Sequence, residues 1–159
     1  VVVLGWFNTS GKRLHLVDPC TAFDTRTNHG AQGAFAGVRV GGQTTTYQVT
    51  GDIPTAQGGY SPAPGPTVDC GVPATATAAY LNHLGVNALR RGNLAAIPAG
   101  GAVVGGTLTF GNLTPNMNNA NALPVALSAG EIDIYTNAGA PNVGLPTAEI
   151  RGVLYGYYQ

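Results

Sequence analysis

The two cysteines of this chain, Cys20 and Cys70, constrain its fold more than any other feature of the sequence. Because there is no third cysteine, a single internal disulfide is the one pairing available. A cysteine pair can also belong to a metal site, but structural zinc sites need four ligands at close spacing, and the sequence does not supply them. We therefore predict a Cys20–Cys70 disulfide. In the chain-entropy model, closing this loop stabilises the folded state by about 4 kcal/mol.

The disulfide also predicts where the protein works. Disulfides persist in oxidising compartments, so we expect a secreted protein with an extracellular or cell-surface location. The chain begins at Val1 without an initiator methionine or a signal-peptide pattern, which suits a mature chain whose signal has been removed. Its apolar runs are far shorter than the roughly 20 residues that cross a bilayer, so we expect no transmembrane segment.

Charged residues are scarce in this chain. They make up 9% of the sequence against a typical fraction of about 25%, and the formal net charge is +0. A nucleic-acid-binding surface needs a basic stripe, which Arg90 and Arg91 are too few to provide, so we expect no nucleic-acid partner. A surface without net charge lacks the repulsion that keeps protein molecules apart, which favours self-association. The alternative is that low charge is ordinary for a secreted β-domain rich in Thr, Asn and Gly.

Short strand-like runs recur along the chain, and turn-rich pieces separate them. The runs cover residues 44–49, 75–81, 107–110, 131–135 and 148–158, and the turn-rich pieces cover residues 58–66 and 111–119. β-Branched and aromatic residues favour strands, whereas Gly, Pro and Asn favour turns. Residues 75–81 also contain helix formers, but their alternation with Thr favours a strand. This pattern predicts an all-β protein, an antiparallel β-sandwich or jelly-roll-like domain with long loops and one disulfide.

Two of these runs also predict which side chains share a face of a sheet. Glu131 and Asp133 alternate with isoleucines, so the two acids are expected together on a solvated face. In the last run, Glu149 and Arg151 are expected side by side on one face, because successive side chains of a strand point to opposite faces.

Residues 1–15 are predicted to form an apolar N-terminal strand or arm, and residues 16–159 a single β-sandwich domain. An apolar terminal strand can complete the sheet of a neighbouring copy by β-augmentation. Alternatively, it pairs with residues 14–17 of its own chain as an ordinary hairpin. In the first case the assembly contacts are Val1, Val2, Val3, Leu4, Trp6 and Phe7.

Several short motifs occur in an order that resembles a known family. They are Pro-Cys-x-x-x-Asp-Thr-Arg at residues 19–26, Cys-Gly-Val-Pro-Ala at 70–74 with Leu-Asn at 81–82, an Asn-rich stretch at 116–121, and Gly-x-x-Tyr-Gly-Tyr-Tyr at 152–158. Together they resemble a β-domain that is widespread in secreted and cell-surface bacterial proteins. The sequence departs from that family's pattern at Thr21, at residues 82–84 and at residues 152–155. The resemblance implies a non-catalytic extracellular module.

The residues best suited to catalysis are Asp24, Arg26 and His29, which lie on one short segment. General acid-base chemistry needs titratable groups that converge on a cleft. We expect instead that Asp24 and Arg26 form a structural ion pair that anchors the loop beside the disulfide. No serine has the surroundings of a hydrolase nucleophile, and the three histidines show no ligand spacing. We therefore predict no enzyme activity, no cofactor and no metal site.

These inferences favour a non-enzymatic extracellular structural protein, a subunit of a filament or other surface assembly held by contacts between β-strands. Its partners would be copies of itself. The alternative is a carbohydrate- or cell-surface-binding module that mediates adhesion, with surface glycans as its partners. The aromatic side chains that could stack on sugar rings are Trp6, Tyr155, Tyr157 and Tyr158, although aromatics at alternating strand positions more often pack within a sheet.

Overall fold

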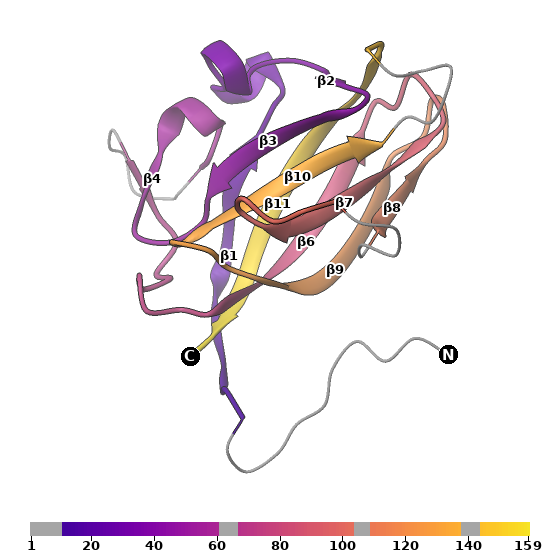
Figure 1. The fold of residues 1–159 in the computed structure, drawn as a ribbon. Helices are drawn as coiled ribbons and strands as arrows, with labels where there is room; N and C mark the ends of the chain where they lie inside the picture. Colours follow the sequence, from indigo (N-terminus) through magenta and orange to yellow (C-terminus); the bar gives the residue numbers. More distant parts are fainter. Residues whose placement is uncertain (1–10, 61–66, 104–108, 138–143) are drawn as a thin grey trace.

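The computed structural model describes residues 11–60, 67–103, 109–137 and 144–159, and over these ranges the protein is an all-β sandwich (Figure 1). The first sheet has the strand order β1-β11-β6-β9, with the short strand β2 paired to the start of β11. Its strands are β1 (Leu14–Asp24), β2 (Arg39–Val40), β6 (Ala78–Val86), β9 (Asn119–Ala126) and β11 (Pro146–Tyr158). All neighbouring strands in it run antiparallel.

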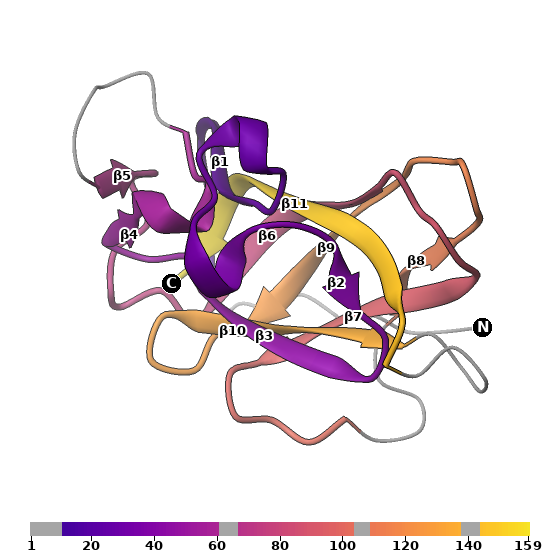
Figure 2. The same cartoon turned by 90° about the horizontal axis from the view of Figure 1, so that it is seen from above.

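The second sheet has the order β3-β10-β7-β8 and is also antiparallel. Its strands are β3 (Gln43–Gln48), β7 (Gly92–Pro98), β8 (Thr109–Leu113) and β10 (Glu131–Asn137). A small separate pair is formed by β4 (Asp52–Pro54) and β5 (Thr67–Asp69). Short 3-10 helices lie in the connections, at η1 (Thr27–His29), η2 (Gly33–Phe35) and η3 (Thr55–Gln57). Seen from above, β3 and β10 lie in one layer and β1, β11 and β6 in the other (Figure 2).

The hydrophobic core lies between the two sheets. Its fully buried aliphatic side chains come from both layers and include Leu81, Leu94, Ile132, Ile134, Ile150 and Leu154. The isoleucines of β10 therefore face the core, as their alternation with acids predicts. Removal of this apolar surface from water is the main force that holds the two sheets together.

An aromatic pair also joins the two layers. The ring of Phe23 in β1 stacks on the ring of Tyr47 in β3, with 4.1 Å between centroids. Phe23 can lie flat against the first sheet because Gly152, its partner on β11, has no side chain: a Cβ atom there would lie 2.3 Å from the Phe23 ring. The absence of a side chain at Gly152 thus makes room for the largest side chain of β1.

The disulfide between Cys20 and Cys70 is present, as the cysteine count predicts. Cys20 lies in the middle of β1, and Cys70 directly follows β5, with 5.5 Å between their Cα atoms. The bond therefore attaches the small β4-β5 pair to the first sheet. Both cysteines are buried.

Most predicted strands are confirmed, and one turn-rich piece is partly wrong. The strand predicted at residues 75–81 is β6, which begins at Ala78 and continues to Val86. Residues 107 and 108 lie outside the described residues. Residues 111–113 were predicted within a turn-rich piece, but they belong to β8, because Gly111, Asn112 and Leu113 pair with β7 and the Leu113 side chain is buried. Pairing with a neighbouring strand outweighs the turn preference of Gly and Asn there.

The prediction that both acids of β10 lie on a solvated face is wrong for Asp133. Its side chain does point away from the core, but it is buried, with an exposed fraction of 6%. Its two oxygens accept hydrogen bonds from Thr46 Oγ1 at 2.6 Å and from the Gly100 N–H at 2.8 Å. The turn that follows β7 therefore covers this carboxylate, a contact that the local sequence of β10 does not encode.

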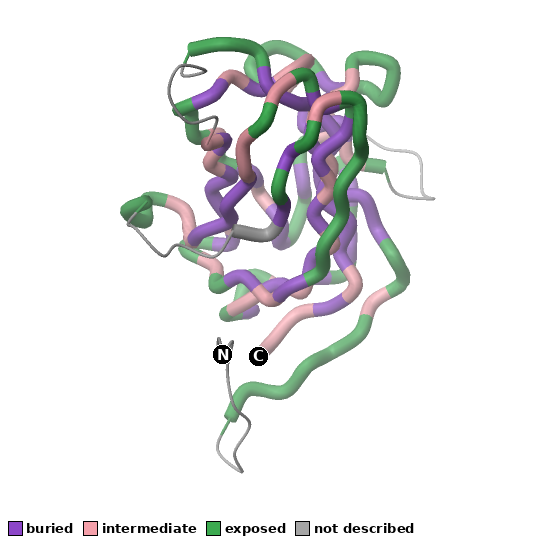
Figure 3. The backbone as a smooth tube through the Cα atoms, turned by 90° about the vertical axis from the view of Figure 1, so that its right-hand side faces the viewer, coloured by how far each residue is buried: buried purple, intermediate pink, exposed green. Residues whose placement is uncertain are grey.

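The predicted assembly contacts, Val1, Val2, Val3, Leu4, Trp6 and Phe7, lie outside the described residues. The first described strand, β1, begins at Leu14, so it starts within the segment that was predicted as an N-terminal arm. Figure 3 shows that the first half of β1 is exposed except for the half-buried Val17, whereas its second half enters the buried centre of the sandwich.

Candidate functional site

The end of β1 is held to β11 by Thr25, which follows the last residue of the strand. The Thr25 N–H donates to the Ile150 carbonyl, and the Thr25 hydroxyl accepts from the Ile150 N–H, both at 2.9 Å. A side-chain oxygen thus takes the place of a backbone carbonyl in the ladder. This arrangement fixes the position of Asp24 and of the residues that follow it.

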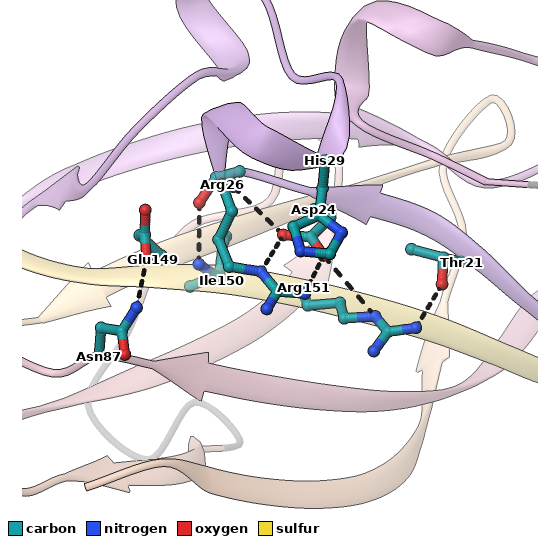
Figure 4. A network of polar contacts seen from close by, with 9 residues as sticks. Thr21, Asp24, Arg26, His29, Asn87, Glu149, Ile150 and Arg151 are labelled. Carbon is teal, nitrogen blue, oxygen red and sulfur yellow. Dashed lines mark hydrogen bonds and ion pairs between the residues drawn. The ribbon is translucent and has the colours of Figure 1, made fainter.

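Asp24 is the centre of a polar network at this end of the first sheet (Figure 4). Its side chain is 2% exposed, and both of its oxygens accept hydrogen bonds from Arg26. Arg26 Nε lies 2.9 Å from Oδ1, and Arg26 Nη2 lies 2.5 Å from Oδ2. The Arg26 backbone N–H also donates to Oδ1 at 3.2 Å. The hydrogen bonds to Asp24 raise the pKa of the Arg26 guanidinium above its ordinary value.

Arg151 approaches Asp24 from β11, because the two residues are cross-strand partners. Its Nε atom lies 3.8 Å from Asp24 Oδ2, and its Nη2 donates to the Thr21 hydroxyl at 2.8 Å. The Arg151 side chain remains 37% exposed. The guanidinium is therefore oriented from two sides but is not enclosed.

His29 lies at the rim of the same network without a hydrogen bond to it. Its Nδ1 atom is 3.9 Å from Asp24 Oδ2, which is too long for a hydrogen bond. Asp24 therefore does not orient the imidazole as the carboxylate of a catalytic pair would. Because Arg26 already occupies both oxygens of Asp24, this arrangement suits an anchoring role better than proton transfer.

The segment after η3 packs directly on Asp24 and Thr21. Gly58 has a positive φ of 75°, and a Cβ atom there would lie 2.0 Å from the Asp24 carbonyl oxygen. Two residues later, the Tyr60 N–H donates to the Thr21 carbonyl at 2.9 Å. This contact places Tyr60 beside β1 with its side chain 72% exposed.

Two adjoining hollows of about 370 and 490 Å³ lie on the outer face of the first sheet, and they share Thr21, Tyr60 and Arg151. We call the two together the β1-β11-β6 groove. The residues that line it are Pro19, Thr21, Asp24, Asn28, His29, Gly58, Tyr60, Asn82, Leu84, Arg151, Val153 and Tyr155. Tyr60 and Arg151 are thus central to the groove rather than part of its edge.

Strand register explains why these residues meet. One row across the sheet is Asp24, Arg151 and Leu84, and the next row is Thr21, Val153 and Asn82. The two rows bring together three strands that are more than fifty residues apart in sequence. On β9, the partners of Leu84 and Asn82 are exposed alanines, so the short side chains of this neighbouring strand leave the groove open on that side.

The other residues singled out in the sequence lie in separate places. His83 is buried in the core near Phe23, with 6.5 Å between ring centroids, and His15 stacks on Tyr157 at 4.9 Å. Of the candidate stacking residues, Tyr155 lines the groove. Within the described ranges, no three His, Cys, Asp or Glu side chains gather as metal ligands.

Sequence reasoning did not find Tyr60, Asn82 or Thr21 as site residues. Tyr60 lies in a turn-rich piece, and the other two lie in the motifs at residues 19–26 and 81–82, which indicated a family resemblance but no site. A signal for Tyr60 did exist, since it is a large aromatic residue in a stretch of Gly and Pro.

The open edge of β1 is the second candidate site. Arg13 and Gln159 exchange two backbone hydrogen bonds, at 3.0 and 3.1 Å. Because such pairs alternate along an antiparallel ladder, the backbone groups of Leu14 and Leu16 point away from β11. In the described part of the chain, no strand pairs with this side of β1 at Leu14 and Leu16, and β1 is the last strand of its sheet. Farther along the same side, Tyr60 forms an isolated β-bridge with Thr21. Leu14 is 41% exposed and Leu16 is 76% exposed.

None of the helical segments in the described ranges has the length and apolar character of a membrane-spanning helix. Comparison with protein-family models finds no match to this chain, and comparison with curated proteins also finds none. The resemblance to a bacterial cell-surface β-domain therefore stays a prediction.

Proposed function

We propose that this protein is a non-catalytic building block of an extracellular assembly, in which copies associate through the open edge of β1. The observation that carries the proposal is the combination, on one short stretch of β1, of outward-pointing backbone groups with the exposed side chains of Leu14 and Leu16. An exposed apolar sheet edge invites pairing with another strand, and soluble proteins usually protect such edges.

The proposed partner of this edge is the segment Val1 to Phe7 of a neighbouring copy. Its sequence is apolar and strand-forming, so it could supply both the main-chain hydrogen bonds and the side chains that cover the two leucines. Burial of a leucine contributes about 2 kcal/mol, and each main-chain hydrogen bond adds about 1 kcal/mol. The edge is short, because Pro19 cannot donate to an added strand.

Charge and covalent chemistry support the same proposal. The formal net charge is +0, so copies of the chain do not repel one another strongly. The disulfide is compatible with an extracellular location. The medium there is oxidising, so the bond would persist in an assembly. The carboxylate of Asp24, the best candidate for catalysis, accepts side-chain hydrogen bonds from Arg26 on both of its oxygens.

Sedimentation velocity over a range of concentrations, together with electron microscopy, tests the proposal on the full chain. We expect the wild type to form oligomers or filaments. Deletion of residues 1–7, or the substitution Leu16→Glu, should give a folded monomer. The matched control is Leu89→Glu, since Leu89 is also exposed, at 53%, but lies in the connection after β6 rather than on the edge. This variant should assemble as the wild type does.

Three outcomes would contradict the proposal. The first is a wild-type protein that stays monomeric at high concentration. The second is loss of the fold when residues 1–7 are deleted, which would place their pairing within the same chain. The third is equal loss of assembly in Leu16→Glu and Leu89→Glu, which would indicate a general effect of added charge.

A further inference from the structure

We infer that the β1-β11-β6 groove binds a saccharide that carries a carboxylate, such as a uronic or sialic acid. The site is separate from the open edge of β1 and does not depend on assembly. Its floor is the outer face of the first sheet, where Thr21, Asn82 and Arg151 come from three different strands.

The charge balance in the groove indicates an anionic ligand. Asp24 is neutralised by Arg26, which donates two side-chain hydrogen bonds to its carboxylate. Arg151 shares the same carboxylate through a longer ion pair of 3.8 Å, so one carboxylate faces two guanidinium groups and a positive charge remains in excess. A guanidinium has five N–H donors and binds carboxylates well because two of its donors match the two oxygens. With one donor engaged by Thr21, others remain for a ligand.

The remaining groups suit a sugar ring. Tyr60, 72% exposed, and Tyr155 both line the groove and provide aromatic surface on which the C–H face of a sugar can pack. Thr21 and Asn82 add a hydroxyl and an amide, which can exchange hydrogen bonds with ring hydroxyls. A ligand with one apolar face, several hydroxyls and one carboxylate matches this set of groups.

The position of the groove argues against a peptide strand as the ligand. β11 is paired on both sides, with β1 and β6, and β6 is paired with β11 and β9. Their backbone groups are therefore engaged, so a peptide that crossed this face could not add as a strand and would leave its own backbone without partners. Nucleic acid is disfavoured as well, because the described lining offers one guanidinium and one imidazole for a whole phosphate backbone.

The experiment titrates the full chain with three acidic saccharides and monitors binding by NMR and calorimetry. The saccharides are trigalacturonic acid, a hyaluronan tetrasaccharide and sialyllactose. Each probe is compared with its methyl ester, which keeps the ring but removes the negative charge. We expect at least one free acid to bind with a dissociation constant below about 1 mM and to shift the resonances of groove residues. Its ester should bind at least tenfold more weakly.

Variants locate the binding to the groove. Arg151→Gln should lower the affinity for the acid at least tenfold and remove the preference over the ester. Tyr60→Ala should weaken binding while keeping that preference, and the fold should tolerate it because Tyr60 is 72% exposed. Arg13→Gln is the matched control, because Arg13 is an exposed arginine outside the groove. Leu16→Glu should also bind normally, so failure of assembly and failure of binding are distinguishable.

Several results would overturn the inference. One is the absence of shifts at groove residues with all three acids at concentrations well above 1 mM. Another is equal binding of acids and esters, or equal effects of Arg151→Gln and Arg13→Gln. Tighter binding of an acidic peptide than of any acidic sugar would assign the groove to a different class of ligand. If Arg151→Gln does not fold, Tyr60→Ala and the ester comparison decide the question by themselves.

Discussion

Asp24 is a buried carboxylate whose partners are all charged or polar. Replacing it with asparagine keeps the shape of the side chain but removes the negative charge that holds Arg26 and orients Arg151. We expect Asp24→Asn to lower the free energy of unfolding by about 2 kcal/mol, because a charge-assisted bidentate pair is lost in a buried site. Urea unfolding measured by fluorescence is the appropriate assay.

The matched control for this substitution is Asp18→Asn, which removes the same charge from an exposed position on the same strand. It should change the stability by less than about 0.5 kcal/mol. An Asp24→Asn variant as stable as the wild type would show that the pair contributes little, and a lost catalytic activity in a fully stable variant would show that Asp24 does chemistry after all.

At the scale of elements, the groove depends on how the segment from η3 to Tyr60 docks on β1. Gly58 is the contact point, since its backbone lies against the Asp24 carbonyl. We expect Gly58→Ala to lower the free energy of unfolding by more than about 2 kcal/mol, because it adds a steric overlap to the cost of a positive φ. The overlap is relieved if the segment moves away from β1, so the environment of Tyr60 should change in NMR spectra as well.

Gly30→Ala is the control that separates the effect of the steric overlap from the effect of the positive φ. Gly30 also has a positive φ, of 92°, but a Cβ atom there would meet nothing within 4 Å. Gly30→Ala should therefore lower the free energy of unfolding by about 1 kcal/mol, because only the unfavourable backbone conformation contributes. Equal losses in the two variants would mean that close packing on Asp24 is unimportant.

For the whole molecule, His83 makes the stability dependent on pH. Burial in the core lowers the pKa of its imidazole to about 3, whereas the unfolded chain has the ordinary pKa of about 6.5. As the pH falls below 6.5, the unfolded chain takes up a proton that the native protein does not. The free energy of unfolding therefore falls from pH 6.5 towards pH 3, and at pH 4.5 the loss from this group is about 3 kcal/mol.

Denaturant unfolding at pH 7 and at pH 4.5 measures this loss. The variant His83→Leu, which cannot titrate, should lose less stability between the two values than the wild type does. His15→Leu serves as the control, because His15 is exposed at the start of β1, and it should behave as the wild type. If His83→Leu and the wild type lose the same amount, the acid sensitivity comes from other groups.

The sequence by itself determined the class of fold, the disulfide and most of the strands. These features depend on information that is local or countable: two cysteines have one pairing, and β-branched and aromatic runs between turns favour strands wherever they occur. The core-facing isoleucines of β10 follow from the two-residue period in the same way. The burial of Asp133 was not predictable, because its cover is the turn after β7.

Only the tertiary structure decided the composition of the groove and which edge of the sandwich remains open. Thr21, Asn82 and Arg151 meet because β11 lies between β1 and β6, and that strand order is not written in any one segment. Tyr60 joins them through a backbone hydrogen bond to Thr21 and the absence of a side chain at Gly58. A strand's sequence specifies which side chains share a face, but which strands become neighbours depends on the packing of the whole chain, because long-range pairing is selected by the free energy of the complete core.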